Sequence, residues 1–413
     1  MRSFILWYKK REIKKEENRL KDTSEKIEQN EKVQENIEKK KDKKRKQDWA
    51  ELDLHINLWK NQNRGKEEFI FDFGFFIDDI KKIKNIYLYI PFKVSSKIID
   101  LGIKVKDKHS LIDAIFNEKC KITSLPIGKR ILVHTEKKEF MFYFLGDDQI
   151  NIKEVNDSHG GSIVEFNVEN ILGKEEEEAF REEGKETEEL LDIKKYYFRF
   201  RLKGNKEDIK FIKNQDYIND SFSNLFTRTE IIDFRLNDIK TCSEVIKEKY
   251  VSNMKFNINK IHYLLLRNFN DDFIYYDGDV SSRMLESDLW KDYIEETDED
   301  LMAYHIKMKR SEEERKNNIY IESFTNLSRF RYQKNNVYIS IKYFIFLLLS
   351  SILPGMTTNL IYEKWDEKKS LPVWALLLLT LAYPIIFTFF FKIGDKFKKN
   401  LLQKVKKKCY NKF

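Results

Sequence analysis

The sequence predicts an α+β membrane protein with three parts: a charged N-terminal helix, a cytosolic antiparallel β-rich domain of sandwich or barrel type, and a C-terminal two-helix transmembrane hairpin. Three observations predict this fold class. The first 62 residues are rich in lysine and glutamate and almost free of glycine and proline. Short aromatic and β-branched runs follow, separated by turn residues. Near the C-terminus, two long stretches without charge stand out from a chain whose mean hydropathy is −0.61.

Residues 1–62 are predicted to form the charged N-terminal helix. Ile13, Leu20 and Ile27 recur every seven positions, a spacing compatible with a coiled coil. One apolar position per heptad is few for a coiled coil, so a solvated helix with i,i+4 ion pairs is the favoured interpretation. The basic block at 39–46 is interpreted as part of the same solvated face.

Residues 66–283 are predicted to form the β-rich cytosolic domain. Phe198 and Phe200 alternate with Arg199 and Arg201, as in a strand with one apolar and one polar face. Many short strands at this spacing are typical of an antiparallel sandwich or barrel. Strands are expected at 67–78, 85–94, 130–135, 139–145, 162–168, 195–204, 231–236 and 260–269.

Helices are expected at 110–119 and in the acidic insertion at 174–192, both inside the β-rich domain. The insertion has few apolar residues to bury, so it is expected at the surface. Residues 284–336 are predicted to form a helical connector, because Leu285 and Leu289 return to helical spacing.

Residues 337–391 are predicted to form the transmembrane hairpin. Its charge-free runs, 343–362 and 370–391, contain 20 and 22 residues. About 20 helical residues cross the ~30 Å hydrocarbon core of a bilayer. Basic residues flank both outer ends, whereas the connecting segment 363–369 is neutral. By the positive-inside rule, the protein is expected in the inner (plasma) membrane as a multi-pass protein with both termini cytoplasmic.

Helix breakers, an interfacial aromatic residue and flanking lysines are expected to carry the membrane function. Proline and glycine interrupt the two runs, and kinked paired helices can pack into oligomers or a pore. The polybasic tail at 392–413 is expected to bind the anionic cytoplasmic leaflet of the lipid bilayer. The residues assigned to this function are Pro354, Gly355, Pro384, Trp374, Lys342, Lys392, Lys396, Lys398 and Lys399.

The distribution of charge favours a lipid partner over nucleic acid. The chain has a net charge of +8, and nine lysines with one aspartate in residues 392–413 supply that amount alone. Residues 1–50 contain seventeen basic and eleven acidic residues, so residues 51–391 are left with a net charge of −6. An acidic body is a poor phosphate-binding surface. Nucleic acid is therefore not expected as a partner.

No catalytic or metal-binding pattern emerges from the sequence, so we expect neither an enzyme nor a cofactor or metal. The Asp-Phe-Gly triplet at 72–74 lies in an aromatic run without the other kinase motifs, and it is interpreted as core. The segment 157–162 is interpreted as a turn. Asp277 and Asp279 match no calcium loop and are also assigned to a turn. Three scattered cysteines predict no disulfide framework.

This organisation predicts a membrane-anchored sensor and effector. It is analogous to bacterial antiviral systems of the abortive-infection type, which often join a soluble sensing module to a transmembrane hairpin. The β-rich domain would bind a partner protein or a small signal molecule encoded nearby, and the hairpins would oligomerise to permeabilise or depolarise the membrane. The alternative is a membrane-tethered scaffold with a protein-binding β-domain and a passive hairpin anchor. A membrane-bound hydrolase or nuclease is a third interpretation that no motif supports.

Overall fold

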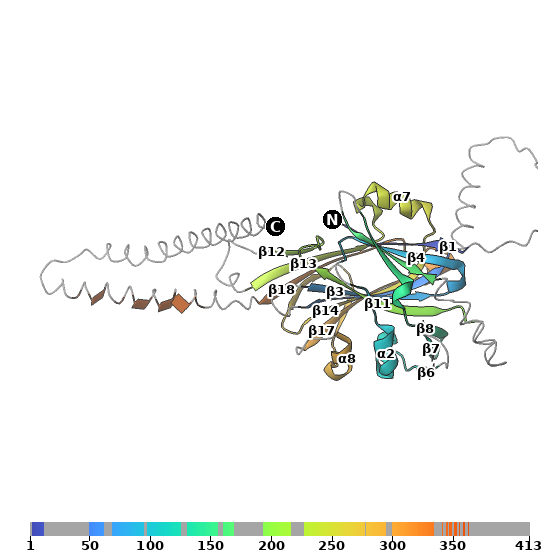
Figure 1. Ribbon diagram of the computed structural model, residues 1–413. Coiled ribbons are helices and arrows are strands. Elements are labelled where there is room, and N and C mark those ends of the chain that lie inside the picture. The colour runs from blue at the N-terminus through green and yellow to red at the C-terminus, as the bar shows by residue number, and fades with distance from the viewer. Residues whose placement is uncertain are drawn as a thin grey trace, which may run out of the picture. The chain divides into compact units, whose positions relative to one another are not determined.

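The computed structural model describes residues 2–11, 49–61, 68–94, 97–124, 130–155, 160–168, 193–215, 227–276, 278–294 and 300–333, with scattered positions between 341 and 362. The larger of two units comprises Met1–Asp216 and Arg228–Tyr332. Strands make up most of its described elements (Figure 1).

The largest sheet has ten strands and carries the candidate site. The order is β16 (Val280–Met284), β17 (Leu301–Lys309), β14 (Asn257–Asn268), β2 (Glu51–Asn61), β3 (Glu68–Ile77), β11 (Tyr196–Asn205), β8 (Glu139–Tyr143), β7 (Arg130–His134) and β6 (Lys121–Ser124), and β5 (Ile99–Asp100) pairs with β11. Neighbouring strands are antiparallel, except that β14 pairs in parallel with β2 and β11 pairs in parallel with β8.

Two four-stranded sheets pack against one face of the large sheet. The first has the order β1 (Ile5–Lys10), β4 (Ile83–Ile90), β10 (Ser162–Asn167) and β9 (Ile150–Glu154). The second has the order β12 (Ile212–Gln215), β13 (Thr227–Leu236), β18 (Phe324–Gln333) and β15 (Asp272–Tyr276).

Aromatic side chains fill the core between these sheets. Successive side chains of a strand point to opposite faces, so every second residue of β3 faces this core. The ring centroid of Phe4 lies 5.5 Å from that of Phe73 on β3 and 5.1 Å from that of Phe234 on β13. Phe75 of β3 and Phe166 of β10 meet edge to face at 6.1 Å. Such pairs add about 0.5–1.5 kcal/mol each to the burial of their apolar surface.

Short helices cover the opposite face of the large sheet. They are α2 (Gly102–Asp107), α3 (His109–Phe116) and α8 (Ser287–Ile294), whose apolar side chains form a second core with that face. In Figure 1, α7 (Glu244–Ser252) lies on the other side of the sheets, where it packs on β1. Further helices of this unit are α9 (Glu312–Lys316) and the 3₁₀ helices η2 (Ile80–Lys82), η3 (Asp147–Gln149) and η5 (Ile239–Thr241).

The predicted N-terminal helix is wrong at both of its ends. Ile5–Lys10 forms β1, and Glu51–Asn61 forms β2. Leu52, Leu54 and Ile56 are each at most 1% exposed, which is the period-2 burial of a strand. The central part of the expected coiled coil, residues 12–48, lies outside the described residues.

The predicted transmembrane hairpin, and with it the fold class and the multi-pass inner-membrane location, is contradicted. Among the described residues, no helix is long and apolar enough to cross a membrane. The longest of the helices named above is α7, whose nine residues span about 13 Å, less than half of a ~30 Å hydrocarbon core. The second predicted span, 370–391, and the polybasic tail, 392–413, lie outside the described residues.

Most predicted strands of the β-rich domain are confirmed, and α3 confirms the helix expected at 110–119. The helical connector is wrong, because 284–336 contains β17 and β18 besides α8 and α9. β17 pairs with β14 over nine residue pairs, and burial alternates along β18. The acidic insertion at 174–192 lies outside the described residues.

Candidate functional site

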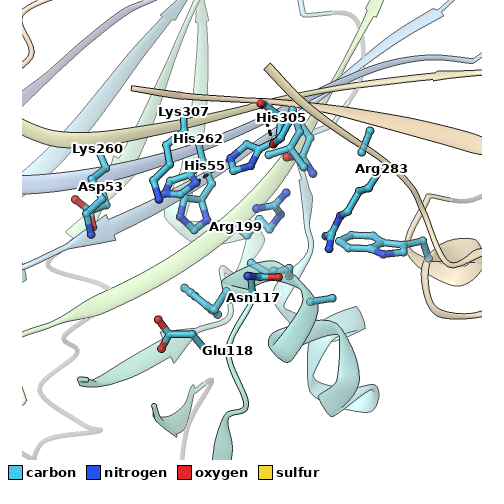
Figure 2. Close-up of a pocket in the computed structure, with 18 of the residues that line it drawn as sticks. Asp53, His55, Asn117, Glu118, Arg199, Lys260, His262, Arg283, His305 and Lys307 are labelled. Atoms are coloured by element: carbon cyan, nitrogen blue, oxygen red, sulfur yellow. Dashed lines mark hydrogen bonds and ion pairs between the residues drawn. The ribbon is translucent and has the colours of Figure 1, made fainter. Parts of the chain in front are cut away.

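A cavity of about 720 Å³ lies on the face of the large sheet that α3 and α8 cover. Its walls come from β2, β14, β17, β16 and β11, from α8, from α3 with the loop that follows it, and from the β7–β8 turn. We call this cavity the cationic cleft. Its charged and histidine lining residues are Asp53, His55, Glu118, Lys137, Lys138, Arg199, Lys260, His262, Arg283, His305 and Lys307. Figure 2 labels all of these except Lys137 and Lys138.

Strand alternation and register bring three histidines together in the cleft. His55 on β2 lies between core-facing neighbours, so its own side chain points to the helix-covered face. The parallel pairing places His262 of β14 beside His55, and the antiparallel pairing places Lys307 of β17 beside His262. His305 is two residues before Lys307 and therefore shares its face.

The three imidazole rings are in direct contact. Nδ1 of His262 lies 3.0 Å from Nε2 of His305, and the two rings stack with centroids 5.2 Å apart. The ring of His55 meets that of His262 edge to face at 5.0 Å. Burial, reinforced by His305 and nearby lysines, lowers the pKa of His262 to about 3. Burial also lowers the pKa of His55 and of His305, so the cluster is uncharged at neutral pH.

A buried guanidinium lies beside this cluster. Arg199 of β11 is 2% exposed and lines the cleft. Its Nη1 donates to the Tyr197 hydroxyl at 3.0 Å, and its Nε donates to the Tyr293 hydroxyl. The second terminal nitrogen, Nη2, has no hydrogen-bond partner within the part of the chain that the structure describes. The charge of Arg199 is thus contacted by two neutral hydroxyl groups and not by a carboxylate.

Two tyrosines connect Arg199 to the residues on either side. The Tyr197 hydroxyl, which accepts from Arg199, lies 3.3 Å from Nδ1 of His55. Its own hydrogen is therefore free to donate to Nδ1, which assigns the ring hydrogen of His55 to Nε2. On the other side, the Tyr293 hydroxyl donates to Oδ2 of Asp72 at 2.7 Å.

The network ends in a buried ion pair. Arg201 donates from Nε and Nη2 to the two carboxylate oxygens of Asp72, at 2.8 and 3.1 Å, and both side chains are at most 1% exposed. Gly74, two residues after Asp72, makes room for this arrangement. A Cβ atom at Gly74 would overlap the ring and hydroxyl of Tyr197, so the glycine allows that side chain to reach His55.

The cleft contains more basic than acidic side chains. Among the described lining residues, six are basic and two are acidic. Nζ of Lys260 lies 3.5 Å from Asp53, and Nζ of Lys137 lies 3.5 Å from Glu118. The basic residues that have no carboxylate within 4.0 Å in the described ranges are Lys138, Arg199, Arg283 and Lys307.

Two buried polar atoms of the lining residues lack a hydrogen-bond partner among the described residues: Nε1 of Trp290, a donor, and Oε2 of Glu118, an acceptor. Buried polar groups in folded proteins are nearly always satisfied, so orphan atoms of both kinds in one cavity are typical of a ligand site.

No family model and no curated protein sequence matches the chain. The cationic cleft itself is therefore the basis for a functional assignment. In the described part of the chain, no group of three or more histidine, cysteine, aspartate or glutamate side chains is arranged to hold a metal ion.

The residues assigned to membrane function lie mostly outside the described residues. Gly355 is described and has a helical backbone, and, its own helix aside, none of the described residues has an atom within 4 Å of the position that a Cβ would take. The other assigned residues lie outside the described residues: Pro354, Pro384, Trp374, Lys342, Lys392, Lys396, Lys398 and Lys399.

The interpretation of the triplet at 72–74 as core is confirmed, since Asp72 and Phe73 are fully buried. Gly160 and Gly161 have φ values of 65° and 135°, in agreement with the turn expected at 157–162. Asp279 lies in the segment between β15 and β16, and Asp277 lies outside the described residues.

The cleft residues were not identified from the sequence. The available signal is polar residues at every second position of apolar strands, such as Asp53 and His55 in β2 and His262 in β14. This pattern indicates a polar sheet face, but it does not show which strands are neighbours.

Proposed function

We propose that the protein is a sensor that binds a small phosphorylated molecule in the cationic cleft. The observation that carries the proposal is the buried guanidinium of Arg199, which lines the cleft and has two tyrosine hydroxyls as its direct partners. The proposal retains the small signal molecule expected from the sequence and does not include the membrane step.

The environment of Arg199 favours an anionic partner. A charge removed from water is costly unless an opposite charge compensates it. The nearest carboxylate in its network belongs to Asp72, which already forms a bidentate pair with Arg201. The unpartnered Nη2 of Arg199 therefore offers a charge-assisted hydrogen bond to a ligand oxygen.

Three further cations make phosphate a better match than a single carboxylate. Arg283 and Lys307 are exposed at the cleft, and Lys138 lies with its Nζ 3.7 Å from the ring centroid of Phe76. Phosphate carries up to two negative charges and accepts several hydrogen bonds, and arginine pairs with it bidentately. A cavity lined by one sign of charge also concentrates ligands of the opposite sign.

The size and charge of the surroundings favour a small molecule over a nucleic-acid strand. The volume of about 720 Å³ falls within the range of small-ligand pockets, which is about 300–1,000 Å³. Residues 51–391 have a net charge of −6, so the positive charge of the cleft is local and not part of a basic surface. A long polyanion would be repelled outside the cleft.

Calorimetric titration of the full chain with inorganic tripolyphosphate, at constant ionic strength, tests the proposal. Replacing both exposed cations in the Arg283→Ala/Lys307→Ala variant should weaken binding by at least about 10-fold, because each charge-assisted hydrogen bond contributes about 1.5–3 kcal/mol. The matched control is Lys249→Ala/Lys316→Ala, which removes two exposed lysines of α7 and α9 and should leave the affinity unchanged. Absence of binding at millimolar tripolyphosphate, or equal affinities of the two double variants, would overturn the proposal.

A further inference from the structure

We infer that the ligand of the cationic cleft is a nucleotide, whose base lies against the loop after α3 and whose phosphate groups face Arg199, Arg283 and Lys307. This inference rests on the proposed function, because it names the ligand class of the same cleft. It is carried by polar and aromatic groups of the lining, of which the Glu118 carboxylate is the one that a phosphate oxygen cannot satisfy.

Glu118 is the first of these groups. Its Oε1 lies 3.5 Å from Nζ of Lys137, whereas its Oε2 is buried and has no hydrogen-bond partner in the described ranges. Phosphate oxygens are acceptors at neutral pH and cannot satisfy a carboxylate oxygen. The ligand must therefore also contain a hydrogen-bond donor, such as the N–H groups at the edge of a nucleobase, which carboxylates recognise in other proteins.

The backbone around Glu118 is fixed by local hydrogen bonds. Asn117 ends α3 in the left-handed conformation with a φ value of 53°, and the Glu118 amide donates to the Asp113 carbonyl at 3.2 Å. The Asp113 side chain accepts from the Cys120 amide at 2.8 Å. The Asn117 side chain, which also lines the cleft, provides both a donor and an acceptor next to the carboxylate.

Trp290 is the second unsatisfied group. It is 5% exposed and lines the cleft, and its buried Nε1–H has no acceptor among the described residues. An indole nitrogen is a donor only, so it requires an acceptor atom of the ligand. An oxygen of a phosphate group can be this acceptor, so Trp290 fits a nucleotide but does not by itself distinguish it from phosphate.

Two aromatic rings also line the cleft. The ring of Phe116 packs edge to face on Tyr197 at 4.9 Å and lies 5.8 Å from the ring of His55. Both Phe116 and His55 line the cleft. Nucleobases stack favourably on such rings, whereas phosphate gains nothing from them.

The unsatisfied carboxylate and the histidine cluster lie at different sides of the cleft. In Figure 2, Asn117 and Glu118 lie across the cavity from His55, His262 and His305. A ligand that contacts both sides must have two chemically different ends. A nucleotide combines a polyanionic end with a flat heterocycle that carries donors and acceptors.

Calorimetric titration of the full chain with ATP, GTP, CTP and UTP, compared with inorganic tripolyphosphate, tests the inference. We expect at least one nucleotide to bind about 10-fold or more tightly than tripolyphosphate. Glu118→Ala should remove most of this difference without weakening the binding of tripolyphosphate. Glu248→Ala, which removes an exposed carboxylate of α7, is the control and should leave the difference intact.

The possible outcomes separate this inference from the proposed function. If tripolyphosphate binds and no nucleotide binds more tightly, the nucleotide inference is wrong and the anion-binding function stands. If a nucleotide binds more tightly but Glu118→Ala retains the full difference, the placement of the base is wrong. If neither tripolyphosphate nor any nucleotide binds, both proposals fail.

Discussion

The hydroxyl oxygen of Tyr197 lies 3.3 Å from Nδ1 of His55, although the two residues are 142 positions apart in the chain. The register explains this contact: Gly74 of β3 is the neighbour of both His55 on β2 and Arg199 on β11, and it has no side chain. Tyr197 reaches across the glycine and connects the histidine cluster to Arg199. The electrostatic properties of the cleft therefore depend on Tyr197, which shares a face of β11 with Arg199 but is not among the lining residues.

Replacing Tyr197 with phenylalanine should disconnect this network. Arg199 would lose an acceptor and His55 a donor, both in a buried environment. Leaving such groups unsatisfied costs about 1–3 kcal/mol, which urea unfolding would measure as a lower free energy of unfolding. Nitrogen NMR of the histidine side chains should also show that His55 no longer holds its hydrogen on Nε2 alone.

The control for this variant is Tyr143→Phe. Tyr143 is equally buried, and its hydroxyl accepts from Gln149 outside the cleft. It should lose a comparable free energy of unfolding with no change in the His55 signals. If the two variants give the same His55 spectrum, Tyr197 does not determine the tautomer.

The Asp72–Arg201 pair should be essential for stability. In Asp72→Asn, the guanidinium of Arg201 would remain 1% exposed without its counter-charge, and breaking a buried pair in this way costs about 3–5 kcal/mol. In a second, more exposed pair, Arg235 also bonds both oxygens of Asp233, and the Arg235 side chain is 25% exposed. Asp233→Asn should cost less, because Arg235 keeps its bond to Asp238 and its contact with water.

Chemical unfolding of both variants at neutral pH checks this difference. The destabilisation of Asp72→Asn is expected to be at least twice that of Asp233→Asn. Similar midpoints and slopes for the two variants would show that the network beneath the cleft tolerates an unpaired Arg201.

The strands were predictable where alternating side chains lay in a largely apolar part of the sequence. They were not predictable where a charged segment came directly before the alternating side chains. Tyr196–Asn205 is β11 almost as predicted, because aromatic and basic residues alternate along it. In β2, Leu52 and Leu54 alternate with acidic residues and histidine just as regularly. The preceding lysine-rich segment led to a helical interpretation, although period-2 burial is the stronger signal.

The cleft could not be predicted because its residues meet only through the order of the strands. His55 and His262 are neighbours through a parallel pairing of strands far apart in the chain, and composition does not determine such a pairing. The net charge was misleading for a related reason. An acidic total for residues 51–391 conceals basic side chains that four strands and one turn direct into one cavity.

His262 should make the free energy of unfolding sensitive to acid. Its pKa is about 3 in the folded protein, because of burial and the neighbouring His305, Lys307 and Lys260, against an ordinary value of 6.5. Between pH 6.5 and about 3, the unfolded chain therefore binds a proton that the folded chain excludes. Stability from this source is fully present above pH 6.5 and is lost as the pH falls, with a slope of up to about 1.4 kcal/mol per pH unit.

Replacing His262 with glutamine should remove this contribution. Urea unfolding at several pH values from 7 to 4 should show a flatter decline in stability for His262→Gln than for the unmodified protein. Leu264→Ala, at a cleft-lining position of the same strand, is the control: it should lower the free energy of unfolding by a similar amount at every pH, because no proton is involved. If the free energy of unfolding falls equally steeply with pH in His262→Gln and in the unmodified protein, His262 titrates alike in the folded and unfolded states and the prediction is wrong.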